Sequence, residues 1–212
     1  MNLANKITMS RIFMSVLILL VLLFPWYQFG VRIPTYVIRG SMVIELKYII
    51  VGIIFVIASL TDFLDGYVAR KYNMVTDFGK MIDAISDKLL TNTLIVVLAC
   101  ENMVHPVIAV IIIGRDIIVD SIKMLIGNRG KAVAAIGVAK WKTATLMVGL
   151  ALKLFYDLPF SLFSFRVSDY LLIIAAVLSI VSGVKYYIMC KEYITEKWLP
   201  LVIFFLFRNR LF

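Results

Sequence analysis

Four aspartates in the first half of the chain have a spacing that could support chemistry. Asp62 and Asp65 are three residues apart, and Asp83 and Asp87 are four residues apart. At 3.6 residues per turn, each pair lies on one face of a helix. Both predicted helices merge into apolar runs, where isolated negative charge is costly. Carboxylate oxygens are ligands that hard divalent ions prefer, so two helices with two aspartates each could hold a pair of metal ions.

Small residues share the faces of these aspartates. Gly66, Ala69 and Arg70 fall on the stripe of the first pair, and Gly79 falls on that of the second. Small residues beside ligands leave room for a substrate or for close contact between helices, and both alternatives stay open. Arg70 is the only basic residue on the first stripe, so divalent ions suit the four carboxylates better than arginine does.

The composition predicts a membrane protein. The chain has 212 residues, of which 62% are hydrophobic and 17% are charged. A soluble domain of this size could not bury so much apolar surface. The net charge of +9 could suggest nucleic acid, but no basic stretch has interleaved aromatic residues. Membrane topology and contact with lipid headgroups explain the positive charge more simply, and we expect no nucleic-acid partner.

The apolar runs predict an all-α integral membrane protein with six transmembrane helices. A polar stripe of Asn2, Asn5, Thr8 and Arg11 predicts a short amino-terminal interfacial helix before the first span. We expect one membrane domain over residues 1–190, a loop over 30–46, and an interfacial or flexible tail over 191–212. The predicted spans cover residues 12–29, 47–70, 78–100, 104–126, 138–157 and 168–190.

Basic residues orient the predicted helices. Most of the 22 lysines and arginines fall at the amino terminus, the junction between spans 2 and 3, the region between spans 4 and 5, and the tail. The positive-inside rule places these segments in the cytoplasm. We therefore expect a multi-pass protein of the cell membrane, with both termini and the aspartates on the cytoplasmic side.

The spacing from Asp62 to Asp87 resembles the signature of the CDP-alcohol phosphotransferase family of membrane enzymes, D-x2-DG-x2-AR-x8-G-x3-D-x3-D. The resemblance implies the fold of that family and two Mg²⁺ or Mn²⁺ ions around the pyrophosphate of a CDP-linked substrate. It implies that all four aspartates are ligands and that Asp87 is also the general base. The nucleotide contacts that it implies are Asn5, Thr8, Gly66, Ala69, Arg70 and Gly79.

Other segments resemble bacterial phosphatidylglycerophosphate synthases, a branch of this family. They are the run NKITMSR from Asn5, the run FGKMIDAISDKLL from Phe78 and the triplet at 114–116, and the likeness extends to about residue 188. This resemblance implies transfer of a phosphatidyl group from CDP-diacylglycerol to glycerol 3-phosphate, with release of CMP, by a homodimer in the lipid bilayer. Because Ala84, Ser86 and Ala139 depart from the pattern, inositol phosphate, serine and phosphatidylglycerol stay open as acceptors.

Three basic residues are candidates for binding the phosphate of the acceptor. Arg115 lies among apolar residues, where a charge needs a partner, which could be Asp116, Asp120 or an acceptor phosphate. Lys140 and Lys142 are two residues apart and cannot share a helix face, so one of them is expected to point inward. Their resemblance to basic residues of the family's acceptor pocket favours phosphate.

A cation or proton transporter is the alternative from another class of protein. Carboxylates within a membrane relay cations in such proteins. This alternative gives no reason for the glycines and alanine on the aspartate faces, or for a separate basic cluster.

Overall fold

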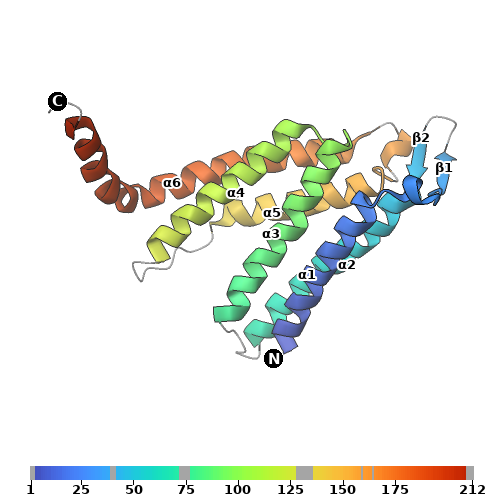
Figure 1. Ribbon diagram of the computed structural model, residues 1–212, viewed down its shortest axis with the longest axis horizontal. Coiled ribbons are helices and arrows are strands. Elements are labelled where there is room, and N and C mark those ends of the chain that lie inside the picture. The colour runs from blue at the N-terminus through green and yellow to red at the C-terminus, as the bar shows by residue number, and fades with distance from the viewer. Residues whose placement is uncertain are drawn as a thin grey trace. The chain divides into compact units, whose positions relative to one another are not determined.

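The part of the chain that the structure describes forms six α-helices and one short β-hairpin in the computed structural model (Figure 1). Two short 3-10 helices, Trp26–Phe29 and Phe160–Phe163, lie in connecting segments. The hairpin consists of β1 (Thr35–Ile38) and β2 (Met42–Glu45). The α-helices are α1 (Leu3–Leu23), α2 (Leu46–Lys71), α3 (Asp77–Cys100), α4 (Pro106–Gly127), α5 (Gly137–Leu154) and α6 (Val167–Arg208).

The structure describes residues 3–38, 42–71, 77–127, 136–158, 160–163 and 165–208. Within these ranges it does not describe the side chains of residues 3–8, 38, 42, 62–71, 77–81, 83–84, 162–163 and 192–208.

The chain divides into two compact units. The first contains Met1–Ala109 and Thr145–Ile173, and the second contains Val110–Ala144 and Ile174–Phe212. Helices α4, α5 and α6 therefore each contribute residues to both units. In the first unit α1 lies against both α2 and α3. Apolar side chains such as Ile18, Phe55 and Leu94 are buried there.

Helix α1 is continuous from Leu3 to Leu23. The predicted division at residue 12 between an interfacial helix and a span is therefore wrong. The sequence has no glycine or proline between these ends, so nothing interrupts the helical hydrogen bonds. Pro25 follows the helix and precedes the 3-10 helix, so the regular helix also ends earlier than the predicted residue 29.

The segment predicted as a loop contains the antiparallel hairpin of β1 and β2. Its register pairs Thr35 with Glu45 and Val37 with Val43. The strands are rich in β-branched and aromatic residues, which favour extended backbone. The all-α fold class is therefore confirmed, whereas the prediction of a loop over residues 30–46 is wrong for these eight positions.

Polar side chains tie the hairpin to the helices of the first unit. The hydroxyl of Tyr156 accepts a hydrogen bond from the backbone N–H of Glu45 at 3.1 Å. The ring of Tyr156 meets that of Tyr48 edge-on, with centroids 5.9 Å apart. Lys47 forms ion pairs with Glu45 at 3.1 Å and with Glu101 at 3.8 Å. These contacts hold together segments that are distant in the sequence.

The start of α6 is capped by a buried carboxylate. Asp157 accepts hydrogen bonds from the backbone N–H of Ser168 at 2.7 Å and from its hydroxyl at 2.6 Å. Asp157 has a φ of 57°, in the left-handed region that aspartate tolerates better than most residues. The carboxylate therefore satisfies one of the backbone donors that the first turn of a helix leaves free.

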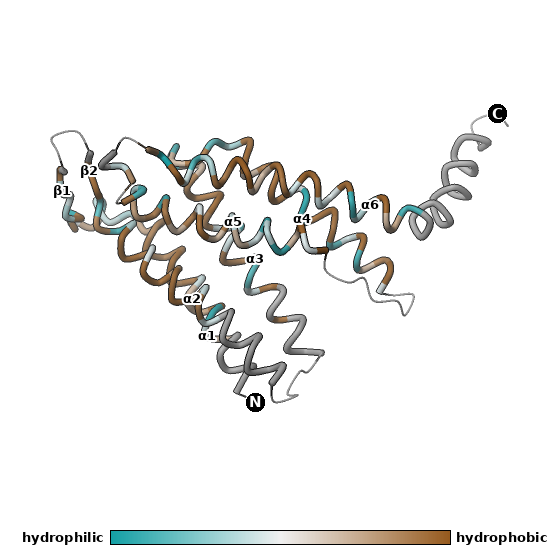
Figure 2. Tube along the Cα trace, turned by 180° about the vertical axis from the view of Figure 1, so that it is seen from behind, coloured by the Kyte–Doolittle hydropathy of each residue, from teal (hydrophilic) through white to brown (hydrophobic). Residues whose placement is uncertain are grey.

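One segment of the described residues is long and apolar enough to cross a membrane, namely Val167–Lys191, with 25 residues. Met9–Leu23 and Leu46–Thr61 are shorter apolar helices, and Figure 2 shows runs of hydrophobic residues in these three helices. The six predicted helices are confirmed as helices, whereas their membrane crossing stays a prediction. Helix α6 continues past the predicted residue 190 to Arg208.

The cap on α6 gives a test of the fold. Asp157→Ala removes both acceptors and places alanine at a positive φ, so we expect the free energy of unfolding to fall by about 1–3 kcal/mol. Thermal unfolding of purified protein in detergent measures this loss. Asp157→Asn is the matched control, because it keeps a carbonyl acceptor and tolerates the same φ. Equal stability of the alanine variant and the wild type would contradict the cap.

Candidate active site

The backbone places the four predicted metal ligands on two helices of the first unit. Positions 62 and 65 lie in α2, and positions 83 and 87 lie in α3. The predicted helical spacing of each pair is therefore confirmed. Most of the predicted site residues have side chains that lie outside the part of the chain that the structure describes. These residues are Asp62, Asp65, Asp83, Asn5, Thr8, Gly66, Ala69, Arg70 and Gly79.

Asp87 is the predicted ligand whose surroundings are described. It is partly buried on α3, and its backbone carbonyl accepts a hydrogen bond from the Thr91 hydroxyl at 3.0 Å. The preceding Ser86 is fully buried. Its hydroxyl accepts a long hydrogen bond of 3.4 Å from Nη1 of Arg11. Arg11 is only 1% exposed, so α1 brings a buried cation to the segment that carries the catalytic candidate.

The donor set suits divalent metal ions in its chemistry. Four carboxylates at one-turn spacing on two helices supply oxygen ligands without nitrogen or sulfur, as Mg²⁺ and Mn²⁺ prefer. No group of three or more possible ligand side chains occurs among the side chains that the structure describes. Three of the four predicted ligands are outside that set, so the metal site stays a prediction.

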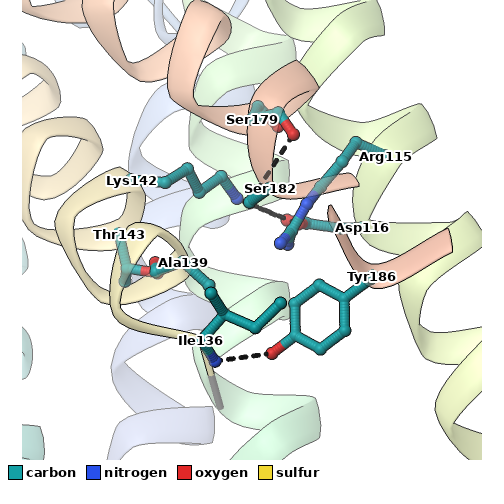
Figure 3. A network of polar contacts seen from close by, with 9 residues as sticks. All are labelled: Arg115, Asp116, Ile136, Ala139, Lys142, Thr143, Ser179, Ser182 and Tyr186. Atoms are coloured by element: carbon teal, nitrogen blue, oxygen red, sulfur yellow. Dashed lines mark hydrogen bonds and ion pairs between the residues drawn. The ribbon is translucent and has the colours of Figure 1, made fainter. Parts of the chain in front are cut away.

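The second unit contains a buried ionic cluster of Arg115, Asp116 and Lys142, which we call the basic cluster (Figure 3). Nζ of Lys142 lies 2.9 Å from Oδ1 and 2.8 Å from Oδ2 of Asp116. Nη1 of Arg115 donates to the same Oδ1 at 2.9 Å. Asp116 is 7% exposed and Lys142 is 4% exposed. One carboxylate from α4 thus serves two cations, one of which belongs to α5.

Arg115 keeps unused donors on one edge of its guanidinium. Its side chain is 13% exposed, and its Nε and Nη2 atoms are buried without a hydrogen-bond partner among the described residues. A buried donor without a partner costs about 1–3 kcal/mol. The Nε and Nη2 hydrogens point the same way and together match two oxygens of a carboxylate or phosphate. The geometry of these two donors therefore suits an oxyanion, and phosphate binding by the basic cluster stays a prediction.

Neighbouring residues fix the course of the Arg115 side chain. A Cβ at Gly183 of α6 would lie 3.2 Å from Cγ of Arg115, so the glycine makes room for the aliphatic stem. Cζ of Arg115 lies 5.6 Å from the centre of the Tyr186 ring, and Nζ of Lys123 lies 5.1 Å from it. The fully buried Tyr186 accepts a hydrogen bond from the N–H of Ile136 at 3.2 Å (Figure 3).

The structure separates the two lysines that the sequence left undecided. Lys142 points inward, whereas Lys140 is exposed and has no ion pair among the described residues. The partner of Arg115 is Asp116, and it is one of the alternatives that the sequence offered. Sequence reasoning missed Gly183 and Tyr186. The only available signal was their position one helical turn apart on the face of an apolar helix.

The helical architecture, the apolar helix surfaces and an aspartate signature on two helices define a class of helical membrane enzymes. The family described as CDP-alcohol phosphatidyltransferase matches residues 1–191 of the chain. The chain belongs to this family of enzymes, as the aspartate signature predicted.

Several curated relatives of similar length carry the name CDP-diacylglycerol–glycerol-3-phosphate 3-phosphatidyltransferase. The relative from Bacillus subtilis (strain 168) is 34% identical over 186 residues, which cover 88% of this chain and 93% of the relative. The relative from Rickettsia bellii (strain RML369-C) is 33% identical over 193 residues, which cover 91% of this chain and 97% of the relative.

The burial of the two lysines gives a test of the basic cluster. An amine-acetylating reagent added to purified protein should modify Lys140 quickly, because its ammonium group is exposed. Lys142 should stay unmodified until the protein unfolds, because its Nζ is buried and ion-paired with Asp116. Mass spectrometry of peptides over a time course measures both rates. Equal rates in the folded protein would show that Lys142 is not buried.

Proposed function

We propose that the protein transfers the phosphatidyl group of CDP-diacylglycerol to glycerol 3-phosphate. The acceptor's hydroxyl oxygen forms a bond to the phosphorus that carries diacylglycerol, and the bond from this phosphorus to the CMP oxygen breaks. The hydroxyl proton moves to a base, and the products are phosphatidylglycerophosphate and CMP. Family membership and the shared name of the relatives support this reaction.

The observation that carries the choice of acceptor is the buried basic cluster. Arg115 and Lys142 both donate to Asp116, and the formal charges of these three residues sum to +1. The phosphate of glycerol 3-phosphate would supply negative charge, and its oxygens would accept hydrogen bonds from Nε and Nη2 of Arg115. The carboxylate of serine could accept the same two hydrogen bonds, but it carries less negative charge than the phosphate monoester of glycerol 3-phosphate and would attract the two cations less strongly. Lys140 is not part of this proposal, because it is exposed.

Asp87 is the proposed general base of the transfer. A carboxylate within hydrogen-bond distance of the attacking hydroxyl can take its proton as the new bond forms. Asp62, Asp65, Asp83 and Asp87 are the proposed ligands of two divalent ions, Mg²⁺ or Mn²⁺, which when bound neutralise the charge of the pyrophosphate. The proposed nucleotide contacts are Asn5, Thr8, Gly66, Ala69, Arg70 and Gly79.

The proposal includes six membrane-spanning helices. Large apolar side chains are exposed on every helix, as expected for surfaces that face lipid. Examples are Phe13, Leu60, Val96, Val110, Val148 and Ile188. The distribution of lysine and arginine supports a cell-membrane protein with both termini and the active site in the cytoplasm. We further propose a homodimer, a membrane domain over residues 1–190 and an interfacial or flexible tail over 191–212.

Family membership decides between an enzyme and the alternative transporter. The chain matches a family of phosphatidyltransferases over residues 1–191, and the match includes all four aspartates. The carboxylates therefore need no role in cation transport.

An acceptor panel tests the proposed function. Purified protein in detergent or lipid is given CDP-diacylglycerol, Mg²⁺ and one acceptor at a time, and the release of CMP is measured. We expect rapid release with glycerol 3-phosphate, no release in excess chelator, and recovery with Mg²⁺ or Mn²⁺. Asp62→Asn and Asp83→Asn should abolish turnover, because each removes a ligand charge. Efficient turnover with serine or inositol phosphate, and none with glycerol 3-phosphate, would contradict the assignment.

The role of Asp87 gives a separate prediction. Asp87→Asn keeps the shape of the side chain but cannot take a proton, so kcat should fall by at least about 10²–10⁴-fold. Single-turnover measurement of CMP release separates this chemical step from product release. Asp169→Asn is the matched control, since Asp169 is a partly exposed carboxylate that pairs with Lys153. Near-normal turnover of the Asp87 variant would place the base elsewhere.

A further inference from the structure

We propose that Asp116 is a positioning residue that holds Arg115 and Lys142 together as a phosphate-binding pair and thereby sets the preference for a phosphorylated acceptor. The inference rests on the proposed function, because it concerns how the acceptor is recognised. Asp116 itself, as an anion, would not bind phosphate. It acts through the two cations that it contacts.

The contacts of the carboxylate fix two helices at once. Asp116 lies in α4, whereas Lys142 lies near the start of α5 and approaches both carboxylate oxygens within 2.9 Å. Nη1 of Arg115 shares one of these oxygens. Two cations that share one oxygen repel each other, and the carboxylate between them is what keeps them close. Without it, the pair would separate and its geometry would be lost.

The same contact orients the remaining donors of Arg115. With Nη1 held by Asp116, the plane of the guanidinium is fixed and its other edge presents Nε and Nη2. This edge is the one that matches two phosphate oxygens. The missing Cβ of Gly183 leaves room for the stem of the same side chain, and the ring of Tyr186 lies near its guanidinium. The acceptor therefore meets donors that are already aligned, which lowers the entropy lost on binding.

A simpler role for Asp116 predicts the opposite effect on affinity. If the carboxylate only neutralised charge, its removal would leave the site more positive, and phosphate would bind more tightly. If it positions the cations, its removal weakens phosphate binding in spite of the added positive charge. The sign of the change in affinity therefore distinguishes the two roles.

The experiment compares equilibrium binding and turnover in wild type, Asp116→Asn and Asp116→Glu. Radiolabelled glycerol 3-phosphate is the binding probe, with the full chain in lipid nanodiscs and Mg²⁺ present. We expect Asp116→Asn to raise both Kd and KM for glycerol 3-phosphate at least tenfold, with little change in KM for CDP-diacylglycerol. Asp116→Glu should recover part of this loss, because it restores the charge. Asp169→Asn should leave all these constants unchanged.

These readouts do not depend on how much of a variant folds, because Kd and KM are independent of the concentration of active protein. Tighter or unchanged binding of glycerol 3-phosphate to Asp116→Asn would overturn the proposal. An equal rise in KM for both substrates would also overturn it, since that result indicates a general structural role.

A double variant tests whether Asp116 acts through Arg115. Arg115→Ala alone should raise Kd for glycerol 3-phosphate at least tenfold. In the Arg115→Ala background, Asp116→Asn should raise Kd by a clearly smaller factor than it does in the wild type. The reason is that the cation through which Asp116 acts is already absent. Fully additive effects would contradict the positioning role.

Failure of the proposed function has a different outcome. Wild-type protein that binds glycerol 3-phosphate but releases no CMP would refute the transfer reaction, while the binding comparison still tests Asp116. Wild-type protein that transfers to glycerol 3-phosphate but responds to Asp116→Asn with tighter binding would refute the role of Asp116 alone. Absence of any glycerol 3-phosphate binding by wild-type protein would overturn both.

Discussion

Charge placed among apolar side chains needs a partner, and the interactions of the second unit follow from this constraint. Arg115 and Lys142 are both largely buried, and each forms an ion pair with the carboxylate of Asp116. Removing one partner from such a group leaves an uncompensated buried charge, which costs about 3–5 kcal/mol. On α6, Gly183 leaves room for the stem of Arg115, and the ring of Tyr186 lies near its guanidinium. The contacts between α4, α5 and α6 in this unit are therefore organised around one ionic cluster.

The same constraint shapes the first unit. The cation of Arg11 is buried on α1 and reaches the hydroxyl of Ser86 on α3. Asp157 is buried, and its two carboxylate oxygens accept hydrogen bonds from the backbone N–H and the hydroxyl of Ser168 at the start of α6. Asp157 lies where the first turn of α6 would otherwise leave a backbone donor unsatisfied. Ser86 is one of the positions that depart from the pattern of similar enzymes, and here its hydroxyl has a defined partner.

The sequence predicted the six helices and the family because those features are local and periodic. Helical spacing of apolar residues defines helices, and the aspartate signature lies within two of them. The errors arose where tertiary contacts decide the outcome. The β-hairpin depends on pairing between Thr35–Ile38 and Met42–Glu45 and on the hydroxyl of Tyr156, more than a hundred residues away. The choice between Lys140 and Lys142 depended on the exact start of α5, which sequence patterns locate poorly.

An experimental structure of the protein in lipid, with glycerol 3-phosphate bound, tests most directly whether the basic cluster is a phosphate site. The account predicts phosphate oxygens within hydrogen-bond distance of Nε and Nη2 of Arg115, with Asp116 still between Nη1 of Arg115 and Nζ of Lys142. A phosphate bound elsewhere, with Nε and Nη2 of Arg115 satisfied by protein groups or water, would contradict it.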